Sequence, residues 1–170
     1  AVADADWHLA ARYLDAEQRG TEPGAERARL LTELGRLRAA ELGQPELALA
    51  AFEAARAADP DSEEAALCVA RHHAERGRYA EAEPLTAWLV GRAGRHSRDA
   101  ELAIQLLHGR TALELGKPAE ALPCYEAARK LDLTHEEAIL GAAEASYRMG
   151  DWQGADVALL VRRVRERLQP

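Results

Sequence analysis

Four glycines recur at a nearly constant spacing, and this recurrence constrains the fold more than any other feature of the chain. They lie 34, 39 and 34 residues apart and are Gly43, Gly77, Gly116 and Gly150. Five residues after each glycine stands an alanine, at Ala48, Ala82, Ala121 and Ala155. Self-similarity at a fixed period is the signature of repeat architectures. The sequence therefore predicts an array of one supersecondary unit.

Each recurring position of the repeat has a physical reason. A glycine closes a helix well because the residue after a helix often needs a positive φ, which only glycine adopts cheaply. Pro45 and Pro118 follow two residues after a glycine, where a first helical turn tolerates proline. Seven residues before the last three glycines stand small residues, which allow two helices to approach closely: Ala70, Gly109 and Ala143. Bulkier residues fill the layer beside them: Phe52, Tyr125 and Leu159. The unit is therefore predicted to be a pair of antiparallel helices joined at the glycine.

Composition supports a helical chain. Of 170 residues, 38 are Ala and 24 are Leu, whereas Val, Ile and Thr together supply only 13. Because strands favour β-branched and aromatic side chains, this mixture excludes a sheet protein and predicts an all-α fold. Two first helices are expected to begin with capping boxes, in which Asp61 pairs with Glu64 and Thr134 pairs with Glu137.

A 34-residue helix–turn–helix unit with these columns resembles the tetratricopeptide repeat, over residues 29–169. The resemblance implies a right-handed superhelical solenoid of antiparallel helix pairs in a single domain. The predicted divisions are a half-repeat helix at 5–19 and repeats at 25–62, 63–96 (with an insertion loop at 91–99), 100–135 and 136–169. The family's first-helix Trp position is not retained and holds Ala66, Gln105 and Ile139.

The resemblance also implies a site, because the first helices of tetratricopeptide proteins line a concave face that holds a partner segment. The family's spacing places these residues on that face: Glu33, Leu37, Glu64, Leu67, Arg71, Glu75, Leu106, Arg110, Leu113, Glu114, Leu140, Glu144, Tyr147 and Arg148, together with Glu137 in the last repeat. An apolar strip flanked by charges suits a partner with hydrophobic anchors and a polar rim. Since acids outnumber bases, a mixed or basic partner is expected rather than a strongly acidic one.

A clamp for an acidic peptide is disfavoured. The family's chaperone-binding members use two lysines, an asparagine and an arginine on their first helices, but this chain has no Asn, and neither of its two lysines, Lys117 and Lys130, stands on a first helix. Arg71 and Arg110 occupy matching positions of adjacent repeats, and together they could hold one carboxylate.

Other chemistries find little support in the sequence. Cys68 and His72 are four residues apart on one predicted helix, but no third or fourth metal ligand follows, so no metal or other cofactor is expected. No catalytic motif is present, and no enzyme activity is predicted. The net charge of -7 argues against nucleic-acid binding, although the arginine-rich stretch at 161–168 is amphipathic. We interpret that stretch as an exposed end of the array.

Cellular location and origin are constrained only by composition. The two cysteines are expected to be free thiols in a reducing compartment. No stretch is long and uncharged enough to span a membrane. The expected location is therefore the cytoplasm, with a removed leader left open because the chain begins at Ala1 without Met. An excess of 20 Arg over 2 Lys, with abundant Ala, is typical of a GC-rich bacterial genome.

The predicted function is a non-enzymatic protein–protein interaction scaffold that binds a partner segment on the concave face. The alternative is an assembly or regulatory arm of a larger protein, or a homo-oligomer.

Overall fold

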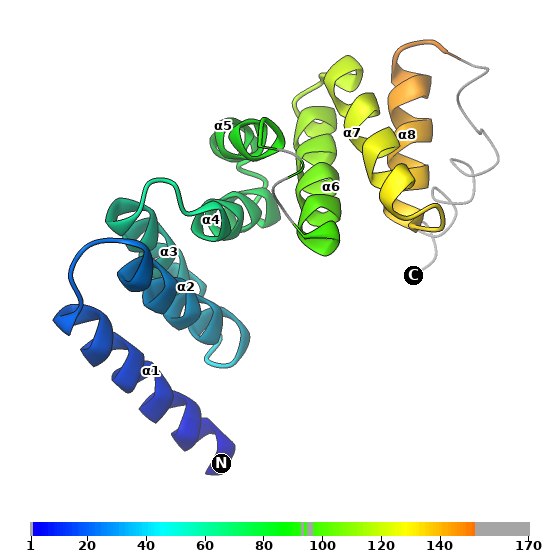
Figure 1. Cartoon of the computed structure of the whole chain (residues 1–170). Helices are drawn as coiled ribbons and strands as arrows, with labels where there is room; N and C mark the ends of the chain where they lie inside the picture. The colour runs from blue at the N-terminus through cyan, green and yellow to red at the C-terminus, as the bar shows by residue number, and fades with distance from the viewer. Residues whose placement is uncertain (1, 93, 95–96, 152–170) are drawn as a thin grey trace. The chain divides into compact units, whose positions relative to one another are not determined.

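The computed structural model describes residues 2–92, 94 and 97–151 of the chain (Figure 1). Within these residues all regular structure is α-helical, and no strand is found, so the predicted all-α fold is confirmed. The chain divides into two compact units, Ala1–Glu75 and Arg76–Pro170, which are described separately. In the described part, no helix is both long and apolar enough to cross a membrane.

The first unit contains four helices: α1 (Val2–Gly20), α2 (Ala25–Ala40), α3 (Pro45–Ala58) and α4 (Glu63–Glu75). Helix α2 packs against each of the other three. One buried cluster joins α1, α2 and α3 through Ala11, Leu34 and Ala51. A second joins α2, α3 and α4 through Ala28, Leu31, Ala55 and Ala65. The abundant alanines therefore lie where helix backbones approach one another, with leucines filling the space between them.

The second unit repeats this arrangement with α5 (Tyr79–Val90), α6 (Arg98–Glu114), α7 (Pro118–Leu131) and α8 (Glu136–Arg148). Helix α6 packs against α5, α7 and α8, as α2 packs against its three neighbours. Its core again combines alanines with a few large side chains: Leu106, Ala112, Leu113, Ala121, Tyr125, Ala128, Ala138, Ala142 and Ala145. The two units thus share one order of helix contacts.

The repeated glycines adopt the conformation that the sequence predicts. Their φ angles are 58°, 70°, 72° and 78° for Gly43, Gly77, Gly116 and Gly150. At the end of α6, the Lys117 N–H donates to the carbonyl of Ala112 at 2.8 Å and the Gly116 N–H donates to that of Leu113 at 3.1 Å. These two bonds form a Schellman motif, which satisfies carbonyls that the helix end leaves without partners. Pro45 and Pro118 begin α3 and α7, as expected from their spacing.

Neither predicted capping box is found. Ser62, not Asp61, caps α4, since its hydroxyl accepts a hydrogen bond from the Ala65 N–H at 3.3 Å. The Thr134 hydroxyl donates to Asp132 at 2.8 Å, and α8 begins after His135 without a side-chain cap. Because Asp132 in the preceding turn holds the Thr134 hydroxyl, this hydroxyl does not cap the first turn of α8. Both predictions were therefore wrong in their capping residue.

Several observed boundaries differ from the predicted ones. Helix α1 extends from Val2 to Gly20 rather than over 5–19, and α6 already begins at Arg98, inside the predicted loop at 91–99. The Ser97 hydroxyl caps α6 by accepting from the Ala100 N–H at 3.3 Å. The predicted second repeat has its first helix in the first unit and its second helix in the second unit. The predicted last helix, after Gly150, lies outside the described residues.

Candidate functional site

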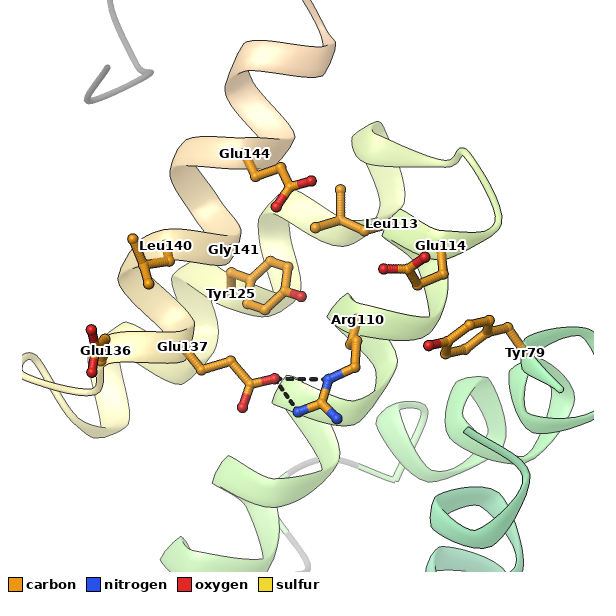
Figure 2. Close-up of a pocket in the computed structure, with 10 residues that line it drawn as sticks. All are labelled: Tyr79, Arg110, Leu113, Glu114, Tyr125, Glu136, Glu137, Leu140, Gly141 and Glu144. Atoms are coloured by element: carbon orange, nitrogen blue, oxygen red, sulfur yellow. Dashed lines mark hydrogen bonds and ion pairs between the residues drawn. The ribbon is translucent and has the colours of Figure 1, made fainter. Parts of the chain in front are cut away.

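A groove of about 480 Å³ lies within the second unit, and all four described helices of that unit contribute to it (Figure 2). Its apolar and aromatic lining comes from Tyr79 of α5, Leu113 of α6, Tyr125 of α7 and Leu140 of α8. A volume of this size lies in the range of ligand pockets in proteins, about 300–1,000 Å³. The groove is therefore large enough to receive side chains of a partner.

Two glycines determine where the Tyr125 ring can lie. The ring is 2% exposed, and it passes between Gly109 of α6 and Gly141 of α8. A Cβ atom on Gly109 would lie 3.0 Å from the ring, and one on Gly141 would approach three ring atoms more closely than 3.0 Å. Because neither glycine carries a side chain, α6 and α8 can both lie against the tyrosine. The aromatic part of the groove is thus fixed by packing.

An ion pair crosses the groove from α6 to α8. The Arg110 Nε donates to Oε1 of Glu137 at 2.9 Å, and a second guanidinium nitrogen donates to the same oxygen (Figure 2). Burial lowers the pKa of Arg110, but the hydrogen bond and the charge of Glu137 outweigh this effect and raise it above its ordinary value. Arg110 therefore remains charged, and its charge is compensated within the chain.

Three further glutamates complete the lining: Glu114 from α6, and Glu136 and Glu144 from α8. Glu144 pairs with Arg148 one turn later at 2.5 Å, and Arg148 also donates to the Leu113 carbonyl at 2.8 Å. Arg148 thereby links the end of α8 to α6. The rim of the groove is consequently acidic, with one of its carboxylates held by an arginine that stands outside the lining.

The structure brings together five of the residues predicted for the second unit's part of the binding face. Arg110, Leu113, Glu114, Leu140 and Glu144 all line the groove, as does Glu137. Leu106, by contrast, is 8% exposed and packs in the core beside Tyr125. Tyr147 and Arg148 are exposed but are not part of the lining.

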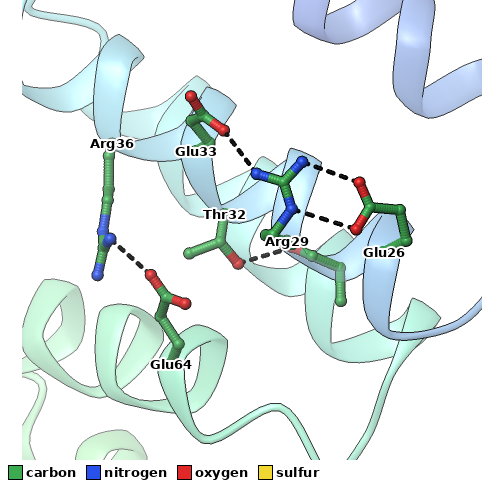
Figure 3. Close-up of polar contacts among 7 residues, drawn as sticks. Glu26, Arg29, Thr32, Glu33, Arg36 and Glu64 are labelled. Atoms are coloured by element: carbon green, nitrogen blue, oxygen red, sulfur yellow. Dashed lines mark hydrogen bonds and ion pairs between the residues drawn. The ribbon is translucent and has the colours of Figure 1, made fainter.

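The residues predicted in the first unit lie in varied surroundings. Glu33 pairs with Arg29 on its own helix at 3.3 Å (Figure 3). Leu37 packs against the cluster that joins α1, α2 and α3, so it contributes to the core. On α4, Leu67 is half-buried, whereas Arg71 and Glu75 are exposed.

The same cross-helix ion pair occurs in both units. Arg36 of α2 pairs with Glu64 of α4 at 2.5 Å (Figure 3), as Arg110 of α6 pairs with Glu137 of α8. Each arginine directly follows a glycine that faces an aromatic ring of the next helix, and Gly35 faces Phe52 in the first unit. The idea that Arg71 and Arg110 hold one carboxylate together gains no support, because Arg110 is engaged by Glu137 and the two arginines belong to different units.

Four lining residues were absent from the prediction: Tyr79, Tyr125, Glu136 and Gly141. The repeat pattern assigns Tyr125 to packing alone, whereas in the structure Tyr125 both lines the groove and fills the core. Gly141 could have been noticed from the sequence, since a glycine within a helix usually has a packing reason. Tyr79 and Glu136 stand at first turns of helices, where the repeat pattern gives no functional signal.

Both cysteines are free thiols. Burial raises the pKa of Cys68 above its ordinary value, and burial together with nearby Glu120 raises the pKa of Cys124 to about 11. Among the described residues, no group of three or more His, Cys, Asp or Glu side chains could hold a metal ion. The pair Cys68 and His72 therefore acquires no further ligand there.

Comparison with known proteins identifies the class. The family model described as the tetratricopeptide repeat matches residues 33–94 and 106–162, which is more than half of the chain. The chain belongs to the tetratricopeptide repeat family, whose members are helical solenoids and serve as protein-interaction scaffolds. No curated protein matches the sequence.

Solved structures of the same fold include several of MamA. A double mutant of MamA from strain RS-1 is 17% identical with a TM-score of 0.74, covering 96% of this chain and 88% of that one. MamA from Desulfovibrio magneticus RS-1 is 19% identical with a TM-score of 0.72, covering 96% and 87%. The tetratricopeptide protein TTC0263 from Thermus thermophilus is 21% identical with a TM-score of 0.56, covering 73% and 66%. At these identities the likeness concerns the fold alone.

Proposed function

We propose that this interaction scaffold binds a segment of a partner protein in the groove of the second unit, without catalysis. The supporting observation is the groove itself, which combines an apolar and aromatic lining with a charged rim. Peptide-binding surfaces commonly have this composition, because buried apolar anchors supply affinity and polar groups at the rim supply orientation. The groove is formed by side chains from four helices, so it is absent from any isolated helix pair.

Selection of peptides from a random library against the whole chain would test this proposal. Leu140 lines the groove and is half-buried, so Leu140→Gln should weaken the binding of selected peptides by about tenfold or more, as expected for losing one buried leucine contact. Leu133→Gln is the matched control, because Leu133 is 77% exposed and lies outside the groove. Circular dichroism would verify that both variants remain helical.

The proposal would be wrong if the selected peptides bound Leu140→Gln and the wild-type chain equally well. It would also be wrong if Leu133→Gln weakened binding as much as Leu140→Gln, since the loss would then not depend on the groove.

Self-assembly is a second candidate function, favoured by the apolar side chains that α1 leaves exposed. Leu9 and Tyr13 are 48% and 68% exposed and lie one turn apart on the helix. Light scattering would decide between the two candidates. A mass above the 18.5 kDa of one chain that falls to it in Leu9→Ser/Tyr13→Ser would support assembly, and a monomeric wild-type chain would contradict it.

A further inference from the structure

The groove of the second unit contains more negative than positive charge. Among the described residues, its lining includes one arginine and four glutamates, a formal charge of -3. The single arginine, Arg110, is already paired with Glu137. Glu114 is exposed and forms no ion pair within the described part of the chain. A cation entering the groove would therefore meet the carboxylates of Glu114 and Glu136, which form no ion pair among the described residues, whereas an anion would be repelled.

The first unit provides an internal comparison, because its helices α2 and α4 carry the equivalent ion pair. Arg71 takes the place of Glu144, and the repeated glycines Gly43 and Gly116 align Glu41 with Glu114. The positions equivalent to the charged lining are Arg36, Glu41, Glu63, Glu64 and Arg71, two positive and three negative charges, which give a formal charge of -1. Since the first unit packs with the same order of helix contacts, the greater negative charge of the second unit is not required by the fold.

One tyrosine gives the groove a second preference for cations. Tyr79 lines it beside Arg110, and Figure 2 shows the Tyr79 side chain directed toward Arg110. The face of a tyrosine ring attracts a cation by about 0.5–1 kcal/mol at an exposed site. A guanidinium group can stack on a ring and donate to a carboxylate with the same planar group. The arrangement therefore suits arginine better than lysine.

From these observations we infer that the partner segment inserts a basic side chain, preferably arginine, into this groove, with an apolar side chain next to it against Leu113 and Leu140. This inference rests on the function proposed above and specifies the chemistry of the partner. The described lining does not favour acidic peptides, because its one cation is held by Glu137.

Fluorescence anisotropy with three labelled peptides of equal length would test the inference on the full chain. The first peptide carries arginines and leucines, the second has glutamates in place of the arginines, and the third has glutamines there. The arginine peptide should bind at least about tenfold more tightly than the other two, as expected for charge complementarity at a partly buried site. The glutamate peptide should bind weakest.

Matched variants separate the groove from the general acidity of the chain. Glu114→Gln/Glu136→Gln should weaken binding of the arginine peptide by about tenfold. The control Glu81→Gln/Glu126→Gln removes the same charge from exposed positions of the second unit that do not line the groove. It should change the affinity by less than about twofold, which is within the effect of a rim charge screened by salt.

Equal losses in the two double variants would overturn the inference, because binding would then follow overall charge. Equal binding of the arginine and glutamine peptides would also overturn it. If the arginine and glutamine peptides bound equally well and both lost affinity in Leu140→Gln, the groove would still be a binding site, but without the basic preference. If no peptide responded to Leu140→Gln, the proposed function itself would fail.

Discussion

A Cβ atom added to Gly141 would lie within 3.0 Å of three atoms of the Tyr125 ring. Tyr125 is 2% exposed and its ring also lies against Gly109, so it cannot move away from Gly141 in that direction without displacing α6. We therefore expect Gly141→Ala to destabilise the second unit by about 1–3 kcal/mol, as overpacking of a core does. Urea denaturation followed by circular dichroism would measure this change.

Gly109→Ala is the matched control for that experiment. Its added Cβ would lie 3.0 Å from the same ring, which is tight but needs only a small shift. Replacing glycine by alanine within a helix gains up to about 1 kcal/mol, which offsets the crowding. A loss at Gly109 as large as that at Gly141 would show that the ring tolerates neither approach, contrary to the geometry described.

A buried histidine makes the stability of the second unit depend on pH. His108 is 8% exposed, and its Nδ1 lies 2.8 Å from the hydroxyl of Thr86. Burial lowers the pKa of His108, an effect that Glu120 and Glu83 oppose and Lys117 reinforces. An unfolded histidine takes up its proton near about pH 6.5, and the folded one does so at a lower pH. The contribution of His108 is therefore fully present above about pH 6.5 and is lost as the pH falls through the folded pKa.

The measurement is the free energy of unfolding between about pH 7 and 5 in the wild-type chain and in His108→Gln. The variant should lose less stability on acidification, because glutamine does not titrate. His8→Gln, on the exposed surface of α1, should retain the wild-type dependence. If His108→Gln and the wild-type chain lost stability in parallel, another group would have to be responsible.

The two cysteines should react at different rates. Cys124 is 6% exposed and its pKa is about 11, so at about pH 8 only about one in a thousand of its thiols is ionised. Cys68 is less buried. We expect a thiol reagent to modify Cys68 first and to reach Cys124 only when the second unit opens. Mass spectrometry of labelled peptides would follow both reactions, and faster labelling of Cys124 would contradict the burial described.

The ion pair between Arg110 and Glu137 should contribute little to stability. The two side chains are 46% and 34% exposed, and ion pairs of this exposure typically contribute about 0–1 kcal/mol. A double-mutant cycle with Arg110→Gln and Glu137→Gln should give a coupling energy in this range that decreases with added salt. A coupling energy that is much larger than this and does not decrease with salt would mean that the ion pair stabilises the fold of the second unit.

The helical fold and the family could be inferred from the sequence because glycine spacing and small-residue columns directly determine backbone geometry. The positive φ of Gly116 and the proline at the start of α7 are local requirements that one residue satisfies alone. The groove was only partly predictable. Arg110, Leu140 and Glu144 follow from the register of first helices, whereas the contribution of Tyr125 depends on two glycines from different helices.

Leu37 and Leu106 illustrate why the rest could not be predicted. Both occupy positions that the family's spacing assigns to the binding face, yet both pack into a core. Periodicity assigns a residue to one side of a helix, but the tilt of the neighbouring helix decides whether that side is covered. Tilt depends on the volumes of side chains that are far apart in the sequence.

Among the described helices, α2 and α6 each contact all the others of their unit, whereas α1 and α5 each contact only one. Loss of α1 or α5 therefore breaks one interface, but loss of α2 or α6 removes three at once. Transient opening under native conditions should accordingly begin at α1 and α5, and amide protons in α2 and α6 should exchange with solvent last. The residues that form the groove wall on α6 are thus part of the last structure to open in their unit, whereas Tyr79 lies on α5, which opens first. A partner therefore meets an α6 wall that is already shaped before binding.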